Sequence, residues 1–553
     1  MSRVRYFFLA VLLLAGISAS AQNGAPNAQA SARDKDAACR NLVNHPALTI
    51  LSAQIKEASG ATPRYCYVRG LISPAIHYHV QLPLPENWNN KFLMWGDGGT
   101  DGDLDFADYR VSQGYAVANS NTGHDAASEP GAVFAYNNPQ AEIDFGYRAV
   151  HVTISAARSL VKAYYGSDPR YAYFEGCSQG GRQALMEAQR YPHDFDGIVA
   201  GAPAIYYQSS AVSRIEALKR VYSDQFAGDL AFDKDGDGKP ESLMKLGLLE
   251  QTVLVKCDAL DGITDRVIDD PLACKFDPAV DLAAQMCAND TNADACFTTR
   301  QIETIKNLYA GAADSQGKII FKGRALGSEF GWPRHLLPHA GNQLAPSALA
   351  LTADRMNYMF YEKDPGVTPP SLTDLAHIPD KTKNPPEYAW WEFNPDDWSA
   401  GKGAQVSSVI DATDANLTEF LFKRNGKLVI YHGWGDALIS PEPTLDYYKE
   451  VVSTTFSGDA GAASSRARLF MIPGMDHCAG GPGPDNWDRL APVVDWVEKG
   501  LAPDHLVASR RRVNGLVENE RKICAYPQRA VYTGPAGGEN DRANWVQNNF
   551  TCR

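Results

Sequence analysis

The chain has 553 residues, of which 44% are hydrophobic and 10% aromatic, and its formal net charge is −13. A chain of this composition can bury a large core, which excludes an intrinsically disordered protein. It contains no basic stripe of Lys and Arg residues, which argues against a nucleic-acid partner.

The N-terminus has the pattern of a signal peptide. Two arginines precede an apolar stretch from Tyr6 to Gly16, and Ala19-Ser20-Ala21 provides an A-x-A cleavage site. The apolar stretch is too short to span a bilayer comfortably, so export is favoured over a membrane anchor. We therefore expect a secreted or periplasmic protein, with a signal peptide over residues 1–21 and a disordered tail over residues 22–36.

All ten cysteines follow the cleavage site. An even number in an oxidising compartment favours five disulfides over free thiols. Cys177 and Cys478 remain after the neighbouring cysteines are paired; they would form a fifth bridge, and the alternative is a buried free Cys177. Proximity in the sequence suggests the other four pairs, Cys39–Cys66, Cys257–Cys274, Cys287–Cys296 and Cys524–Cys552.

Residues 90–102, NKFLMWGDGGTDG, predict a strand that runs into a Gly-rich loop. Loops of this kind supply a backbone N–H to the oxyanion hole of esterases. Gly99 is the candidate donor, with Gly98 beside it. A simple turn or a phosphate cradle is the alternative, but no G-K-[ST] follows, which excludes a P-loop.

The stretch YAYFEGCSQGGRQALMEAQRY, residues 171–191, predicts a nucleophile elbow. A short aromatic strand leads into the G-x-S-x-G pattern around Ser178, and a helix of good helix formers follows. Such a turn exposes the serine oxygen at a helix N-terminus, where the helix dipole stabilises an oxyanion. We expect Ser178 to be the nucleophile and the N–H of Gln179 to be an oxyanion donor.

Two acidic clusters compete as metal sites. Residues 233–244, DKDGDGKPESLM, begin like an EF-hand, but Met244 stands where a bidentate Glu is required, so a polar turn is favoured. The loop CDALDGITDRV brings Asp258, Asp261 and Asp265 together. Three carboxylates in a short loop repel one another unless a hard cation neutralises them, so this loop predicts a structural Ca²⁺ site.

The acid and the base are expected after two later strands. Residues 427–441 place Asp436 just beyond an apolar stretch, and residues 466–484 place His477 in a Gly/Pro-rich loop. The order Ser178, Asp436, His477 is that of α/β-hydrolases. His432 is a rival base, but it precedes the acid, so we assign it to the pocket wall. The competing acids, which do not directly follow a strand, are Asp411, Asp414 and Asp446.

The two remaining cysteines flank this catalytic pair. Cys177 precedes Ser178 and Cys478 follows His477. A disulfide between them would tie the two loops together and hold the hydroxyl and the imidazole in register.

The stretch between Ser178 and Asp436 is far longer than the remaining core elements need. A large insertion that caps the site and excludes water is the economical explanation. We place this insertion at residues 205–414.

The combined motifs resemble the tannase/feruloyl esterase family, which includes the bacterial hydrolase of mono(2-hydroxyethyl) terephthalate. They are G-C-S-x-G-G-R, H-G-x-x-D, P-G-M-x-H-C-x-G-G-P-G and CDALDGITDRVIDDP, within a resemblance from Cys39 to Cys552. The resemblance implies an α/β-hydrolase core over residues 37–204 and 415–553, an inserted lid domain over residues 205–414, five disulfides in the pattern above, and Ca²⁺ in the lid. It further implies that the carbonyls of Ile263 and Val267 complete the calcium shell.

Family members cleave aromatic carboxylic esters, so the resemblance implies a small-molecule aromatic ester as partner. The terephthalate hydrolase binds its substrate carboxylate with a lid arginine, a position held here by Ser347, and Arg355 is the nearest basic residue. This departure favours a phenolic ester, feruloyl slightly before galloyl, over the terephthalate monoester. A non-catalytic calcium- or glycan-binding protein and a serine peptidase are the alternatives. The expected substrate-pocket residues are Gly98, His432, Leu438, Ile439, Leu351 and Arg355.

Overall fold

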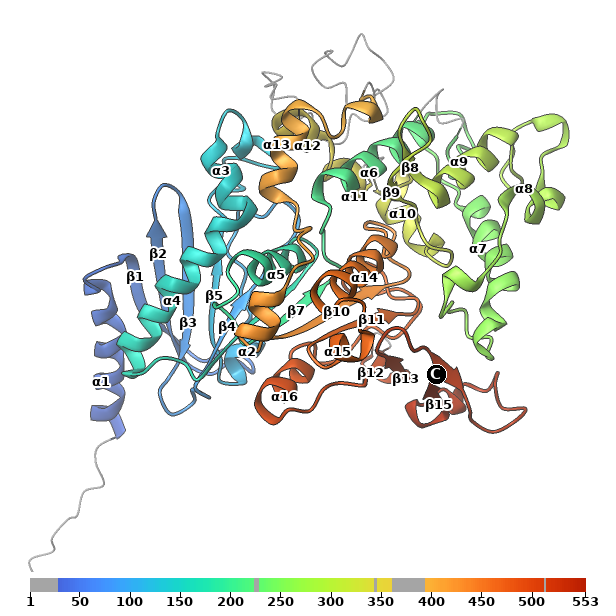
Figure 1. Ribbon diagram of the computed structural model, residues 1–553. Coiled ribbons are helices and arrows are strands. Elements are labelled where there is room, and N and C mark those ends of the chain that lie inside the picture. Colours follow the sequence, from blue (N-terminus) through green and yellow to red (C-terminus); the bar gives the residue numbers. More distant parts are fainter. Residues whose placement is uncertain (1–27, 223–227, 343–345, 361–392, 512–513) are drawn as a thin grey trace, which may run out of the picture.

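The computed structural model describes residues 28–222, 228–342, 346–360, 393–511 and 514–553 (Figure 1). The expected signal peptide and residues 22–27 lie outside these ranges. None of the helices within them combines the length and the apolarity that a bilayer crossing requires.

A nine-stranded sheet forms the centre of the molecule (Figure 1), in the order β1-β2-β3-β5-β4-β6-β7-β10-β11. The pairs from β1 to β5 are antiparallel, and all pairs from β5 to β11 are parallel. The chain adds β5 on one side of β4 and β6 on the other, so ligands are expected at the carboxyl ends of β4 and β6. The strands are β1 (Thr49–Lys56), β2 (Tyr65–Ile72), β3 (Ile76–Pro83), β4 (Lys91–Trp95), β5 (Ala116–Ser120), β6 (Tyr171–Cys177), β7 (Gly197–Gly201), β10 (Lys427–Gly433) and β11 (Ala467–Ile472).

Helices cover both faces of this sheet. Side chains alternate along each strand, so Phe92 and Met94 of β4 pack in one core cluster while Leu93 packs in another. The first cluster lies under α4 (Ala149–Tyr165), α5 (Gln179–Arg190) and α14 (Glu442–Phe456), and the second under α2 (Asp108–Ser112) and α16 (Ala491–Lys499). Shorter helices are α3 (Pro139–Ile143) and α15 (Ala460–Ser464). The sheet and its two helical layers confirm the expected α/β-hydrolase fold.

Residues 205–414 contribute no strand to the central sheet among their described part. They contain a third core cluster, and Figure 1 shows residues 244–310 (green) at the end of the molecule away from β1, while the helix over residues 401–410 (orange) lies nearer the middle. Ala412 N donates to Ile205 O at 2.9 Å, so the chain leaves and re-enters the core at one place. We call this segment the insertion; its boundaries as a domain stay a prediction. Its elements are α6 (Tyr207–Tyr222), α7 (Met244–Cys257), α8 (Pro278–Asp281), α9 (Thr299–Ala310), β8 (Gly311–Ala313), β9 (Ile319–Lys322), α10 (Trp332–His335), α11 (Ser347–Ala350), α12 (Ala353–Arg355) and α13 (Gly401–Ile410).

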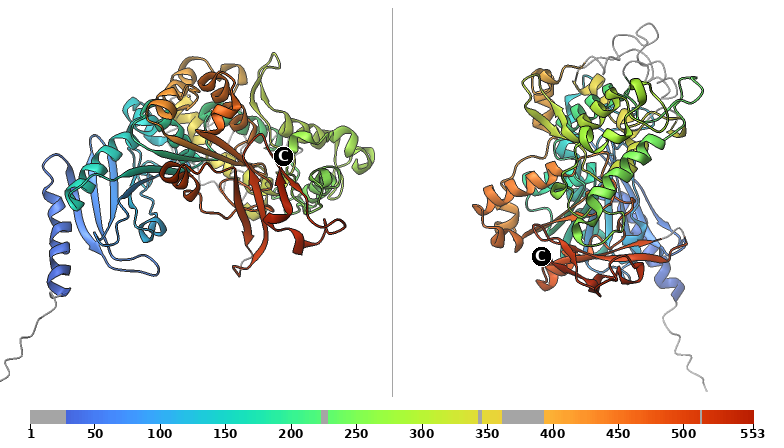
Figure 2. Two further views of the ribbon diagram at one scale, coloured as in Figure 1. Left: turned by 60° about the horizontal axis from the view of Figure 1, so that its bottom comes forward. Right: turned by 90° about the vertical axis from the view of Figure 1, so that its right-hand side faces the viewer.

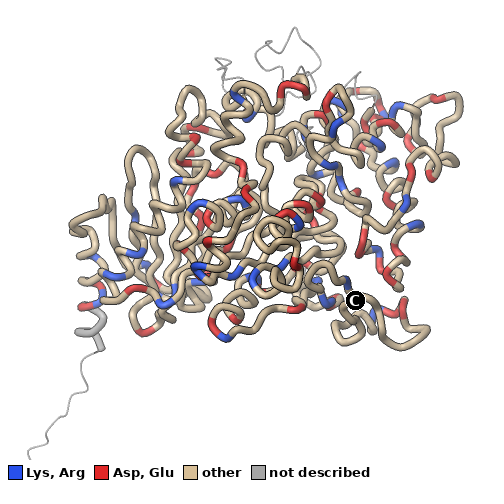
Figure 3. The backbone as a smooth tube through the Cα atoms, in the orientation of Figure 1, with Lys and Arg blue, Asp and Glu red and all other residues tan. Residues whose placement is uncertain are grey.

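The C-terminal segment forms two small antiparallel pairs outside the central sheet, drawn in dark red in Figure 2. They are β12 (His505–Arg511) with β13 (Val517–Cys524) and β14 (Ala530–Tyr532) with β15 (Phe550–Cys552). Figure 3 shows acidic and basic residues interspersed over the whole molecule, so the net negative charge is spread over many elements.

The N-terminal tail needs one correction. Helix α1 covers Ala28–Asn41, so the disorder expected over residues 22–36 was wrong for residues 28–36. This segment is rich in Ala, the best helix former. Asp36 forms an ion pair with Arg64 at 2.9 Å, and Cys39 is bonded to Cys66, so the helix is attached to the edge of the sheet.

The structure contains the five expected disulfides, and no cysteine is free. They join the pairs that the sequence suggested, which are Cys39–Cys66, Cys177–Cys478, Cys257–Cys274, Cys287–Cys296 and Cys524–Cys552.

Candidate active site

Ser178 lies in the sharp turn between β6 and α5. Its φ of +63° and ψ of −118° are strained values for a residue other than glycine. The turn is also tight, because a Cβ on Gly176 would lie 2.7 Å from the backbone of Gly180, and one on Gly181 would lie 2.2 Å from Gly201 O. The turn therefore has the geometry of a nucleophile elbow.

Ser178, His477 and Asp436 form one chain of hydrogen bonds. Ser178 Oγ lies 2.8 Å from His477 Nε2, and His477 Nδ1 lies 2.7 Å from Asp436 Oδ2. Asp436 follows β10 and His477 follows β11, two neighbouring parallel strands whose carboxyl ends meet at the same edge of the sheet. The three residues have the spacing and order of a serine hydrolase triad.

Asp436 is fully buried and accepts hydrogen bonds on both oxygens. Leu438 N and Ile439 N donate to Oδ1 at 2.9 Å and 2.8 Å, and His477 and His432 contact Oδ2. Burial alone would raise the pKa of this carboxyl, but the electrostatic effect of His477 and the hydrogen bonds from both imidazoles hold it well below its usual range. Asp436 is therefore an ionised carboxylate that can orient His477.

His432 does not line the pocket, so its assignment to the pocket wall was wrong. Its side chain is fully buried behind Asp436. Its Nε2 lies 3.1 Å from both Asp436 Oδ2 and Ile439 O, and its Nδ1 lies 2.9 Å from Thr444 Oγ1. Because Nε2 faces two acceptors, it carries the proton and donates to the acid. The sequence alternation along β10 did not indicate this role.

A disulfide ties the nucleophile loop to the base loop. Cys177 and Cys478 are 301 residues apart in the sequence, and their Cα atoms lie 5.9 Å apart. Each is adjacent to one member of the Ser178–His477 pair. The bridge therefore restricts the separation of the two reacting side chains covalently.

Gly99 and Gln179 line the same cavity as Ser178. Gln179 is the first residue of α5, where a backbone N–H has no partner within the helix. Gly99 has a φ of +62°, a conformation that favours glycine. Gly98 does not contact the cavity; its carbonyl instead accepts a hydrogen bond from Asp101 N at 2.9 Å and closes the turn.

The cavity next to Ser178 is small, with a volume of about 20 Å³. Of the residues expected in the pocket, Leu351, Arg355, Leu438 and Ile439 line it. Sequence reasoning missed four other residues, most of them in the first turns of α6. The only signal for them was that α6 follows directly after β7 and so begins at the carboxyl edge of the sheet. The residues missed are Ala204, Tyr207, Ser210 and Arg214.

Two buried arginines line this cavity. Arg214 Nε donates to Thr352 Oγ1 at 2.8 Å, and the Arg355 guanidinium lies 3.6 Å from the centre of the Tyr207 ring. Arg355 Nε is buried without a hydrogen-bond acceptor. No carboxylate of the described residues forms an ion pair with Arg214 or Arg355. The cavity therefore holds two positive charges with which no described carboxylate forms an ion pair.

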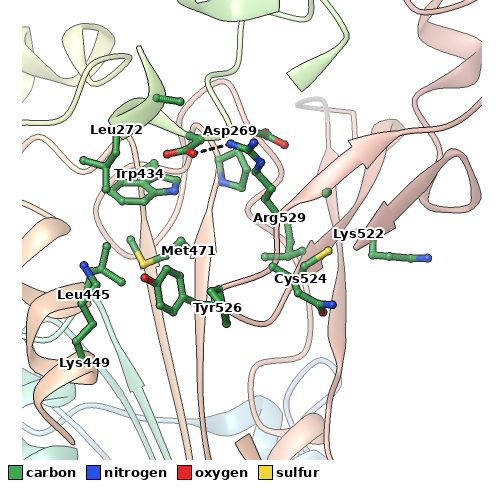
Figure 4. A pocket seen from close by; sticks show the side chains of 17 residues that line it. Asp269, Leu272, Trp434, Leu445, Lys449, Met471, Lys522, Cys524, Tyr526 and Arg529 are labelled. Atoms are coloured by element: carbon green, nitrogen blue, oxygen red, sulfur yellow. Dashed lines mark hydrogen bonds and ion pairs between the residues drawn. The ribbon is translucent and has the colours of Figure 1, made fainter. Parts of the chain in front are cut away.

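A larger cavity of about 300 Å³ lies elsewhere, between β11, α14, the insertion and the C-terminal segment. Figure 4 shows Trp434, Met471 and Tyr526 facing it, with Arg529 at its rim. Arg529 is already paired with Asp270 at 2.7 Å. None of the three triad residues lines this cavity, so its size does not make it the reaction site.

The predicted calcium loop is folded around a buried arginine. The guanidinium of Arg521 forms ion pairs with the carboxylates of Asp261, Asp265 and Asp269. One of its terminal nitrogens lies 3.1 Å from Asp265 Oδ2 and 3.1 Å from Asp269 Oδ1. One guanidinium balances only part of this charge, and neither oxygen of the buried Asp269 accepts a hydrogen bond from a described residue. This excess of negative charge suits a cation, but Asp258, Asp261 and Asp265 are not among the groups of described residues whose oxygens converge within 4.8 Å, and Asp269 was not among the predicted ligands. The predicted ligands are Asp258, Asp261, Ile263, Asp265 and Val267.

The carboxylates of the other acidic loop do converge. One oxygen from each of Asp233, Asp235, Asp237 and Glu241 lies within 4.8 Å of the others. Backbone N–H groups of the same loop occupy these carboxylates, for example Gly236 N at 2.7 Å from Asp233 Oδ1. The loop is hydrogen-bonded within itself, and the expectation that it is a polar turn and not a metal site stays a prediction.

Comparisons with known proteins agree with this geometry. The sequence profile described as tannase and feruloyl esterase matches residues 62–547. The mono(2-hydroxyethyl) terephthalate hydrolase of Piscinibacter sakaiensis is 32% identical over 90% of this chain and 86% of its own length. A probable feruloyl esterase B-1 of Aspergillus fumigatus is 29% identical over 88% of this chain and 86% of its own.

Solved structures show the same fold. The crystal structure of feruloyl esterase B from Aspergillus oryzae superimposes with a TM-score of 0.74 at 25% identity, covering 94% of this chain and 100% of that one. An α/β-hydrolase fold, a Ser-His-Asp chain of hydrogen bonds and a family profile that spans most of the sequence thus agree. The chain belongs to the tannase and feruloyl esterase family and is a carboxylic ester hydrolase.

Proposed function

We propose that the protein is an exported serine esterase that cleaves aromatic esters, feruloyl or other hydroxycinnamoyl esters before galloyl ones, through an acyl-enzyme. The observation that carries this proposal is the continuous contact from Ser178 Oγ through His477 to the ionised Asp436. Apolar side chains of Leu351, Leu438 and Ile439 beside the nucleophile support an aromatic acyl group.

The reaction proceeds in two halves. His477 Nε2 accepts the proton of Ser178 as Oγ attacks the ester carbonyl, and the N–H groups of Gln179 and Gly99 stabilise the tetrahedral oxyanion. His477 then gives the proton to the departing alcohol oxygen. Water, deprotonated by the same imidazole, attacks the acyl-enzyme and releases the carboxylic acid.

The test is a comparison of kcat/KM on methyl ferulate, methyl gallate and mono(2-hydroxyethyl) terephthalate. The highest value should belong to a phenolic ester, and Ser178→Ala should lower every rate by about 10⁴-fold or more. Equal rates for wild type and Ser178→Ala would reject the serine mechanism. Cleavage of a peptide substrate without any of the esters would instead favour a peptidase.

A second candidate substrate is the terephthalate monoester, and a specific observation favours it. Arg214 and Arg355 place positive charge beside Ser178, and none of the carboxylates in the described part of the chain forms an ion pair with them. A carboxylate on the acyl group would form charge-assisted hydrogen bonds with them. If the terephthalate monoester gives the highest kcat/KM in the same comparison, it replaces the phenolic esters as the preferred substrate.

We further propose a structural calcium ion held by Asp258, Asp261 and Asp265 with the carbonyls of Ile263 and Val267. Bound Ca²⁺ would neutralise the charge that Arg521 leaves uncompensated. EDTA should lower the Tm of wild type, and Asp258→Asn should remove this sensitivity. The matched control Asp233→Asn, in the other acidic loop, should keep it; a Tm insensitive to EDTA would reject the site.

Export is proposed from the pattern of residues 1–21 together with the five disulfides, which persist in oxidising compartments. Expression with and without residues 1–21, followed by fractionation, tests it. Retention of the full chain in the cytoplasm would contradict export.

A further inference from the structure

Two carboxylates, each with a buried oxygen, flank the turn that contains Gly98 and Gly99. Asp97 follows β4 and is 3% exposed, and Asp101 N closes the turn on Gly98 O. The two side chains lie within hydrogen-bonding reach of each other. Each has a buried Oδ2 atom without a hydrogen-bond partner among the described residues, and the Thr122 side chain lies next to Asp101.

The other polar atoms of this pair are occupied. Asn119 Nδ2 donates to Asp97 Oδ1, and Gly102 N donates to Asp101 Oδ1 at 2.7 Å. Asp97 N donates to Gln183 Oε1 of α5 at 3.1 Å, which ties the loop to the nucleophile helix. Two ionised carboxylates this close together would repel each other. One proton between them turns this repulsion into a strong O–H···O⁻ hydrogen bond.

We propose that a single proton shared by Asp97 and Asp101 holds the turn that presents the Gly99 N–H to the oxyanion, so that both are positioning residues for the reaction. This inference rests on the proposed function, because it takes Gly99 as an oxyanion donor.

Three other titratable or charged groups face the pair. Asp105 lies on the same loop, His124 on the segment after β5, and Arg182 on α5. Burial lowers the pKa of His124 to about 4, so this imidazole is uncharged near neutral pH and cannot replace the shared proton.

The pair responds to alkaline pH. Burial raises the pKa of Asp97 well above its usual range and that of Asp101 to about 7. With raised pKa values in the folded state, the stabilisation from the bound proton is lost as pH rises through those values. The shared proton is therefore lost as pH rises through these raised pKa values, and its loss should appear as a fall on the alkaline side of the activity profile.

The test compares Asp97→Asn with Asp97→Ala. An amide in place of the protonated carboxyl still donates to Asp101, so Asp97→Asn should lower kcat by only a few-fold and should abolish the alkaline fall of the kcat profile. Asp97→Ala removes the donor and should lower kcat by about 10- to 100-fold with little change in KM, because a displaced turn affects the transition state. Equal kcat values for the two variants, or an alkaline fall unchanged in Asp97→Asn, would overturn the proposal.

Two further measurements do not depend on ester hydrolysis. The infrared difference spectrum of wild type minus Asp97→Asn should contain the C=O band of a protonated carboxylic acid. In a Ser178→Ala background, the alkaline fall of Tm should be smaller with Asp97→Asn. If both appear but no ester is cleaved, the shared proton stands and only the proposed function fails; if the band is missing, the shared proton is refuted whatever the activity.

Discussion

The two sides of the catalytic cavity treat their buried charges in opposite ways. On the core side, Asp436 is fully buried and has hydrogen-bond donors on both oxygens. On the insertion side, Arg214 and Arg355 are equally buried but have no carboxylate partner among the described residues. A charged group that already has hydrogen-bond partners in the protein can orient a reacting side chain, whereas a charged group without an ionic partner can bind the substrate. The comparison therefore separates the residues that catalyse the reaction from those that select the substrate.

The largest loss of activity should come from a substitution on the core side, at Asp436. Asp436→Asn should lower kcat by about 10⁴-fold without loss of fold, because an amide cannot hold His477 in the required tautomer. Steady-state kinetics on methyl ferulate measures this. Asp476→Asn is the matched control, since Asp476 lies 3.4 Å from His335 and outside the triad; its effect should be far smaller. Similar losses in both variants would remove Asp436 from the mechanism.

Removal of the Cys177–Cys478 disulfide should cause the second largest loss of kcat. The double variant Cys177→Ala/Cys478→Ala should lower kcat by about 10- to 100-fold, because small displacements of reacting groups cost about that much. It should also lose about 2–4 kcal/mol of stability. Removing Cys287–Cys296, which spans only 9 residues within the insertion, should leave kcat nearly unchanged. Equal kcat losses from the two removals would mean that neither bridge positions the catalytic pair.

Substitutions on the insertion side of the cavity should change the preference among substrates. Arg355→Leu should lower kcat/KM for the terephthalate monoester by about 30-fold relative to methyl ferulate, since a charged hydrogen bond to a buried carboxylate is worth about 2 kcal/mol. Arg355→Lys keeps the charge and should retain part of the preference. Parallel losses on both esters would assign Arg355 to packing alone.

The last expected effect is not on the rate of reaction but on the pH dependence of stability, where the two regions have opposite signs. In the insertion, burial raises the pKa of Glu329 to about 7, so its stabilising contribution of about 3 kcal/mol is lost as pH rises from about 4.5 through 7. Glu329→Gln should flatten the fall of Tm over that range. The lowered pKa of Asp436 acts in the other direction, and its contribution is lost only in acid. An unchanged Tm profile in Glu329→Gln would contradict this assignment.

The sequence predicted the core better than the insertion. Ser178, Asp436 and His477 each follow a strand, and their order along the chain is a local pattern that needs no tertiary information. His432 was misplaced because its contact with Asp436 depends on how the loop after β10 folds back. Tyr207 and Arg214 were missed because helices of the insertion carry no motif, and their approach to Ser178 follows from packing alone. The helix over residues 28–36 was missed because a polar, Ala-rich sequence is compatible with both a disordered tail and a helix. The Cys39–Cys66 disulfide was expected, but the Asp36–Arg64 ion pair that also holds the helix against the sheet cannot be read from the sequence.

The sulfur bridge beside Ser178 also bears on how such enzymes diversify. Both of its ends lie in the core, and the whole of residues 205–414 lies in the chain between them. The ends of that segment meet at Ile205 and Ala412. The insertion can therefore be exchanged or altered in evolution while the disulfide keeps the catalytic serine and histidine in position. The same catalytic residues can in this way acquire new substrates through changes in the insertion.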